Sequence, residues 1–186
     1  MFRIIIPYLN GFSEAGVTDK ATATSNAYLS YMNQQVFAPS GLATVSMTPT
    51  TYEPSLIYPF PAGTVRGDNL GDWFTVGGGG GLQLSTYDLI AIMRKLRDGT
   101  LLSPGWQSVM DSGGLGWDGT SSPVRHGTFV AKGGGFPPQG NGGALSSVVM
   151  SFNIGLQAAA VINSPTTANI TQTIVDAYNS SWVAVY

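Results

Sequence analysis

The clearest periodic pattern in the chain begins at Ser85. Asp88 follows three residues later, which is the spacing of a helix capping box. Four apolar residues then recur at helical spacing: Leu89, Ile92, Met93 and Leu96. Gly99 stands where a glycine commonly ends a helix. We therefore expect an amphipathic helix here, followed by a short second helix that opens at Ser103-Pro104.

After the second helix the pattern changes to short segments separated by turn-forming residues. Four such segments are predicted to be strands: GLGWDG (114–119), VRHGTFVAKGG (124–134), ALSSVVMSF (144–152) and LQAAAVIN (156–163). Their connections are short, so the strands should pair antiparallel. A last helix is predicted near the C-terminus, because four apolar residues recur on one helical face: Ile170, Ile174, Val175 and Tyr178. The expected fold class is α/β of the α+β type, with three to five antiparallel strands and packed helices.

The first 84 residues are less regular and are predicted to be a helical and irregular region. The apolar run FRIIIPYLNGF (2–12) has no helix start signal, and we interpret it as the tail of a helix whose first half is missing, ended by Pro7 and Gly11. Thr24 or Ser25 is predicted to cap a second helix. Residues 42–76 are rich in proline and threonine, which indicates an irregular connection. We expect this region and residues 85–186 to form one compact unit.

The composition narrows the classes of function. Apolar residues make up 43% of the 186 residues and charged residues 10%, which is typical of a folded domain. The net charge is −2 and no basic stripe occurs, so we expect no nucleic-acid partner. With no cysteine and one histidine, we expect no metal site and no cofactor. No apolar run approaches the ~20 residues of a membrane span, and no signal-peptide core is present.

One lysine, Lys132, stands beside a run of glycines in AKGGGFPPQGNGG (131–143). A lysine on an edge strand commonly serves to discourage strand pairing, and this would be the preferred interpretation of an isolated motif. The surrounding motifs change that preference.

Several motifs follow one another along the chain: NQQVFAPSGL (33–42), GGGGLQLSTYDLIAIMRKLRDGTLLSP (78–104), GLGW (114–117) and KGGGF (132–136), and after these VVMSF and AAAVIN. Their order and spacing resemble those of the serine β-lactamase and penicillin-binding-protein superfamily. They are most similar to class C β-lactamases and to the esterases that share their fold. The resemblance implies a partial β-lactamase-like fold, small-molecule ester, amide or β-lactam substrates, and a bacterial periplasmic or secreted origin.

The resemblance also implies a site. Lys132-Gly133-Gly134 matches a variant of the Lys-Thr-Gly motif on the edge strand beside the superfamily's active site. Lys132 would supply a cation, and Gly135 would donate its backbone N–H to an oxyanion hole. We assign both as catalytic. Gly133, Gly134 and His126, which is expected near the mouth of the cleft, are assigned to substrate binding.

The superfamily's nucleophile motif is missing from the sequence. No serine stands three residues before any lysine, so Ser-x-x-Lys does not occur. A literal Tyr-x-Asn, at Tyr31-Met32-Asn33, lies within a predicted helix and is interpreted as a chance match. We therefore expect the C-terminal part of a hydrolase, with the nucleophile and the first strands upstream. The sheet edge and apolar face left exposed would be covered by a separate N-terminal segment or by a second copy of the chain.

Three alternatives stay open. The chain could be a non-catalytic binding or interaction protein on a truncated hydrolase scaffold. It could also be a repurposed hydrolase, for example of phosphoesters, with a metal held by Asp68 and Asp72. A triad of His126, Asp118 and a serine is a weaker option, because nothing in the sequence fixes its geometry.

Overall fold

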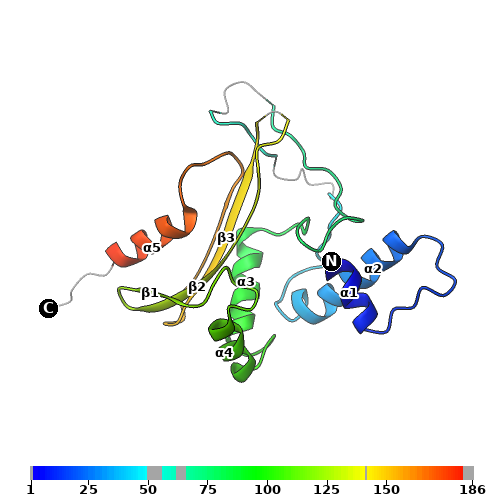
Figure 1. Cartoon of the computed structure of the whole chain (residues 1–186), viewed down its shortest axis with the longest axis horizontal. Helices are drawn as coiled ribbons and strands as arrows, with labels where there is room; N and C mark the ends of the chain where they lie inside the picture. The colour runs from blue at the N-terminus through cyan, green and yellow to red at the C-terminus, as the bar shows by residue number, and fades with distance from the viewer. Residues whose placement is uncertain (1, 50–55, 62–65, 141, 182–186) are drawn as a thin grey trace.

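The computed structural model describes residues 2–49, 56–61, 66–140 and 142–181. A four-stranded antiparallel sheet lies at its centre, with the strands side by side in chain order (Figure 1). The strands are β1 (Ser122–Val124), β2 (Gly127–Phe136), β3 (Leu145–Phe152) and β4 (Gln157–Ile162). The predicted α+β class, with three to five antiparallel strands, is confirmed.

Five α-helices and one π-helical segment lie within the described ranges. They are α1 (Phe2–Leu9), α2 (Lys20–Met32), η1 (Asn33–Phe37), α3 (Thr86–Arg97), α4 (Pro104–Gly113) and α5 (Ile170–Ser180). The predicted start of α3 is confirmed, since Ser85 and Asp88 form a reciprocal capping box. Gly99 follows the helix with a φ of 89°, as expected of a terminating glycine. None of these helices is both long and apolar enough to cross a bilayer.

Two strand predictions were wrong. GLGWDG forms turns after α4, because Gly114 and Gly116 adopt left-handed φ values of 63° and 79° that interrupt an extended chain. The segment 124–134 is a hairpin and not one strand: Arg125 and His126 make a tight turn between β1 and β2.

Two predictions about the N-terminal helices were also wrong. The N-cap of α2 is Asp19, whose carboxylate accepts the Thr22 N–H at 3.0 Å. Thr24 and Ser25 lie buried inside the helix. Pro7 does not end α1, because the proline only removes one backbone donor; the helix continues to Leu9 and stops just before Gly11, whose φ is 85°.

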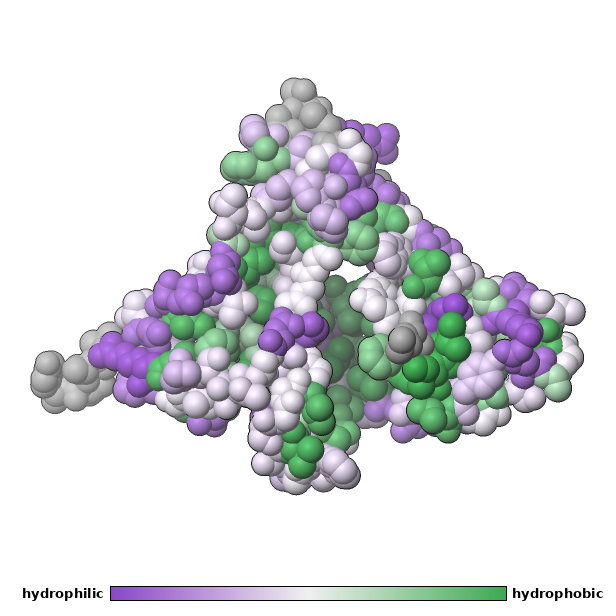
Figure 2. Space-filling model, in the orientation of Figure 1, coloured by the Kyte–Doolittle hydropathy of each residue, from purple (hydrophilic) through white to green (hydrophobic). Residues whose placement is uncertain are grey.

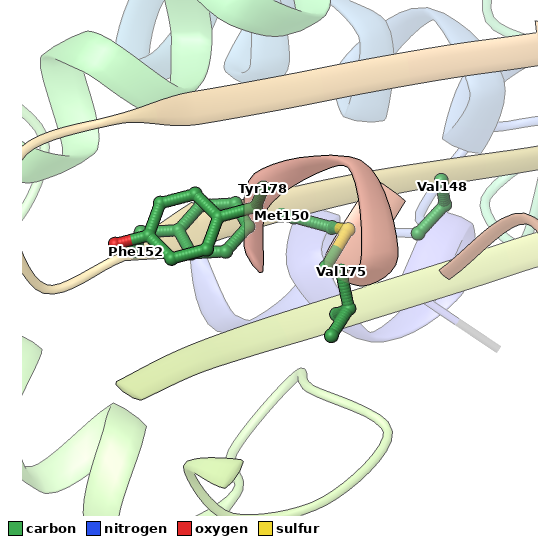
Figure 3. Packing of buried hydrophobic residues seen from close by; sticks show 5 residues of the cluster. All are labelled: Val148, Met150, Phe152, Val175 and Tyr178. Carbon is green, nitrogen blue, oxygen red and sulfur yellow. The ribbon is translucent and has the colours of Figure 1, made fainter. Parts of the chain in front are cut away.

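The two faces of the sheet are covered by different helices. Three residues of β3 point to the face covered by α5, where they pack with two residues of that helix (Figure 3). The cluster consists of Val148, Met150, Phe152, Val175 and Tyr178. A second cluster, formed by Met93, Trp117 and Val130, lies on the opposite face beneath α3 and α4. Apolar side chains therefore hold the sheet from both sides.

The helices α1 and α2 pack against each other to one side of the sheet (Figure 1). The connection between this helical pair and the sheet has fully buried anchors at Met47 and Ile57. It also bonds directly to the end of β4, where the Tyr58 N–H donates to the Asn163 carbonyl at 2.8 Å. A hollow with hydrophobic side chains along it opens between the helical pair and the centre of the molecule (Figure 2).

Candidate functional site: an open strand edge around Lys132

The outer edge of β2 is open where Lys132 lies. β1 pairs with β2 only at residues 127–129 of β2. β3 pairs with residues 129–136 of β2. Among the described residues, the part of β2 beyond Phe129 therefore has a partner strand on one side only. Lys132 lies opposite Val149 of β3, and the three glycines follow it along this edge. Lys132 therefore lies on a stretch of β2 that has one partner strand, although β2 itself is the second strand of the sheet, between β1 and β3.

The side chain of Asp118 binds at this edge. Its Oδ1 accepts a hydrogen bond from Lys132 Nζ, and its Oδ2 accepts one from the Gly133 N–H at 2.5 Å. The Asp118 N–H in turn donates to the Ala131 carbonyl at 2.9 Å. The ammonium of Lys132 and the N–H of Gly133 thus hold one carboxylate at two points. We call these two donors the carboxylate cradle.

The cradle changes the titration of Asp118. The Lys132 ammonium, and after it the Gly133 N–H, lowers the pKa of Asp118 below its ordinary value of 3.8. Both side chains of the pair remain about half exposed, at 53% and 51%. The contact is therefore open to water and to ligands, and an exposed ion pair of this kind is weak.

This pKa shift gives a pH prediction. Because the folded pKa lies below the unfolded one, the contact stabilises the fold above the ordinary value and is lost as the pH falls below 3.8. We expect the carboxyl carbon of Asp118 and the amide of Gly133 to titrate together by NMR in that acidic range. Lys132→Gln should move this titration to higher pH. Lys95→Gln, which removes the exposed partner of Asp98, should leave it in place.

The glycines of the motif are needed for close approach and not for backbone conformation, since none of them has a positive φ. A Cβ at Gly133 would lie 3.1 Å from Asp118 Oδ2, and one at Gly134 would lie 3.1 Å from Ser147 Oγ. A Cβ at Gly135 would lie 2.8 Å from the Leu145 carbonyl oxygen, closer than real side chains approach backbone. Small residues therefore let the cradle and the neighbouring strand come together.

The backbone of Gly135 faces the same edge as the cradle. In an antiparallel pair, the N–H and C=O groups of alternate residues point to the same side of the strand. The Gly133 N–H points away from β3, toward Asp118. The N–H of Gly135, two residues further along β2, therefore also points to the open edge. Three of the predicted site residues, Lys132, Gly133 and Gly135, thus present polar groups along one line.

His126 lies away from these polar groups. It lies in the hairpin turn before β2, and its carbonyl accepts the Tyr178 hydroxyl at 2.7 Å. From Gly127 to Gly133 the strand advances about 20 Å, at roughly 3.3 Å per residue. His126 is therefore remote from Asp118 as well as from Lys132, and the structure does not assemble the triad considered from the sequence.

Two cavities in the described structure lie away from the cradle. One, of about 340 Å³, is lined by polar residues that include Arg97, Asp111 and Ser151. The other, of about 400 Å³, lies between the end of α1 and α2. Neither is lined by Lys132 or by the glycines that follow it. The Lys132 and Asp118 side chains are each about half exposed, so the cradle is open to solvent on the described surface.

The two aspartates considered for a metal make different local contacts, Asp68 through its backbone and Asp72 through its carboxylate. Asp68 forms an isolated backbone bridge with Ile57. The Asp72 carboxylate accepts the Phe74 N–H at 2.8 Å and the Thr48 hydroxyl at 3.3 Å. The described ranges hold no group of three or more histidines, cysteines, aspartates or glutamates that could ligate a metal together.

No family model matches the chain, and searches of curated proteins and of solved structures found no match either. The function is therefore argued from the geometry of the site and from the sequence motifs alone.

Proposed function

We propose that this chain is the C-terminal part of a β-lactamase-like serine hydrolase that acts on ester, amide or β-lactam bonds of small molecules. The observation that supports this proposal most directly is the open edge of β2. There a cation at Lys132 and the backbone N–H groups of Gly133 and Gly135 point to the same side.

Such an edge suits acyl-transfer chemistry. A substrate can lie along an unpaired strand and bond to its backbone, as an added strand would. The Gly135 N–H could then stabilise the negative charge that develops on a carbonyl oxygen under attack. Lys132 could hold a polar part of the substrate or assist a proton transfer. The attacking serine would come from outside this sequence, which contains no Ser-x-x-Lys motif.

The surface supports a partner that completes the fold. The helix α1 exposes several large apolar side chains, among them Phe2 at 61% and Leu9 at 79%. Among the described residues, β4 pairs only with β3, and its sequence QAAAVI carries no charge to discourage further pairing. We propose that an N-terminal segment or a second copy of this chain covers these surfaces, since apolar patches and bare strand edges favour association.

The proposal predicts turnover that depends on Lys132. Joined to the upstream segment that supplies the serine, the chain should hydrolyse p-nitrophenyl acetate or nitrocefin above the buffer rate; the 186-residue chain alone lacks the nucleophile motif and should not. Lys132→Ala should lower that rate by about a hundredfold, the scale of a lost catalytic proton-transfer or charge-stabilising group. Lys95→Ala is the matched control, because Lys95 is also an exposed lysine paired with an aspartate.

The DNA upstream of Met1 offers a second test that does not depend on activity. The proposal predicts an in-frame Ser-x-x-Lys motif there, followed by Tyr-x-Asn close to the first residue. If turnover and this upstream motif are both missing, the chain is not part of such a hydrolase.

A non-catalytic binding protein on the same scaffold is the second candidate. Two observations favour it: the sequence lacks the nucleophile motif, and Lys132 is already paired with Asp118. This candidate predicts no hydrolysis with either substrate, together with saturable binding of a small ligand at the β2 edge. Light scattering of the free chain would show whether association accompanies either activity.

A further inference from the structure

We propose that Asp118 is a specificity-determining residue that makes the β2 edge select uncharged ligands. Its carboxylate occupies the cradle in the way that a ligand carboxylate would, with one oxygen on Lys132 Nζ and the other on the Gly133 N–H. This inference rests on the proposed function in one respect, which is that the β2 edge is the place where a substrate binds.

Asp118 is held in position by its neighbours on both sides. Its own N–H donates to the Ala131 carbonyl on β2. The preceding residue, Trp117, is buried against Met93 and Val130, and its indole N–H donates to Asp111 Oδ1 at 2.9 Å. The backbone of Asp118 is therefore tied to β2 and to the core, so its carboxylate can leave the cradle only by rotation of its own short side chain.

The charges at the cradle then decide which ligands bind. The charges of Lys132 and Asp118 cancel, so this part of the β2 edge offers little net attraction to an anion. An entering carboxylate must displace that of Asp118 and then lie close to it, where like charges repel. A neutral ester or amide meets no such repulsion, and it can still bond to the backbone groups further along the strand.

The test measures binding without hydrolysis. Phenylacetate and its neutral methyl ester are titrated separately into the full chain, and the amide signals of Gly133 and Gly135 are followed by NMR. We expect Asp118→Asn to bind phenylacetate at least tenfold more tightly than the unmodified chain, because Lys132 is left without a counter-charge. Binding of the methyl ester should stay the same within about twofold.

Asp176→Asn on α5 is the matched control, since it changes the net charge by the same amount at an exposed position. It should leave both affinities unchanged. The double variant Asp118→Asn/Lys132→Gln should lose the gain for phenylacetate. Asp118→Ala removes the carboxylate from the cradle altogether and should also bind phenylacetate more tightly than the unmodified chain. This second variant checks that the tighter binding does not come from a new contact made by the asparagine side chain.

Equal affinity of the unmodified chain and both Asp118 variants for phenylacetate would overturn the inference. An equal gain for the acid and the ester would overturn it too, because that result indicates opening of the edge without charge selection. A failure of hydrolysis has no effect on these binding ratios, so the proposed function and this inference can fail separately.

Discussion

Replacing Phe152 with alanine is expected to lower the free energy of unfolding by about 3–5 kcal/mol, the usual range for a buried phenylalanine. The side chain is 1% exposed. Its ring stacks on Tyr178 of α5 with centroids 4.4 Å apart (Figure 3). It also contacts Phe129 of β2, with ring centroids 5.8 Å apart. The substitution would remove the ring that joins β3, β2 and α5, and the cavity left behind would add to the lost burial.

Chemical denaturation followed by circular dichroism measures this effect. Ile154→Ala is a suitable control, because Ile154 lies in the exposed turn after β3 and should cost less than about 1 kcal/mol. Phe152→Leu should fall between the two. If Phe152→Ala costs no more than Ile154→Ala, α5 does not pack on the sheet as described.

Local signals in the sequence were sufficient for the parts of the fold that local interactions determine. The capping box at Ser85 and the glycine at 99 define α3, and both depend only on residues within one or two turns of the helix. The strands β3 and β4 were predicted for a similar reason: each is short, apolar and bounded by turn residues.

The failures occurred where distant contacts override local preference. Thr24 and Ser25 are good capping residues, yet both are buried inside α2, where Arg3 of α1 donates to their hydroxyls. GLGWDG is among the segments predicted to be strands, but two left-handed glycines turn the chain there and Trp117 reaches the core. Neither arrangement can be inferred from neighbouring residues alone.

The same limit applied to the site. The motif around Lys132 predicted a cation on an edge strand; the structure places it on β2, an inner strand whose stretch beyond Phe129 has only β3 as a partner strand. Asp118 was considered only as a partner of His126, because 14 residues separate it from Lys132. The one available signal was its place beside Trp117: a large residue that must be buried fixes where the next side chain can point. The position of the buried indole, and hence of Asp118, depends on Asp111.

Replacing Asp111 with alanine is therefore expected to affect both stability and the site. Asp111 accepts two hydrogen bonds from Arg97, at 2.6 and 3.1 Å, and one from the Trp117 indole at 2.9 Å. The Arg97 and Asp111 side chains are only 20% and 31% exposed. The two terminal nitrogens of Arg97 make these bonds, whereas its buried Nε has no hydrogen-bond partner among the described residues.

We expect Asp111→Ala to lower the free energy of unfolding by about 3 kcal/mol, because it leaves a partly buried cation and an indole N–H without their acceptor. Asp111→Asn keeps one acceptor oxygen for Trp117 and should cost less. Asp176→Ala, at an exposed position on α5, should cost about 0.5 kcal/mol or less. Denaturant unfolding of the three variants provides the comparison.

A second readout tests the connection to the cradle. When Trp117 is released, Asp118 should be held less firmly, and the pKa of its carboxyl should rise back toward the ordinary value of 3.8. The acidic titration of the Gly133 amide should therefore move to higher pH in Asp111→Ala and less so in Asp111→Asn. A destabilised Asp111→Ala chain whose Gly133 titration is unchanged would show that Asp111 supports the fold without positioning Asp118.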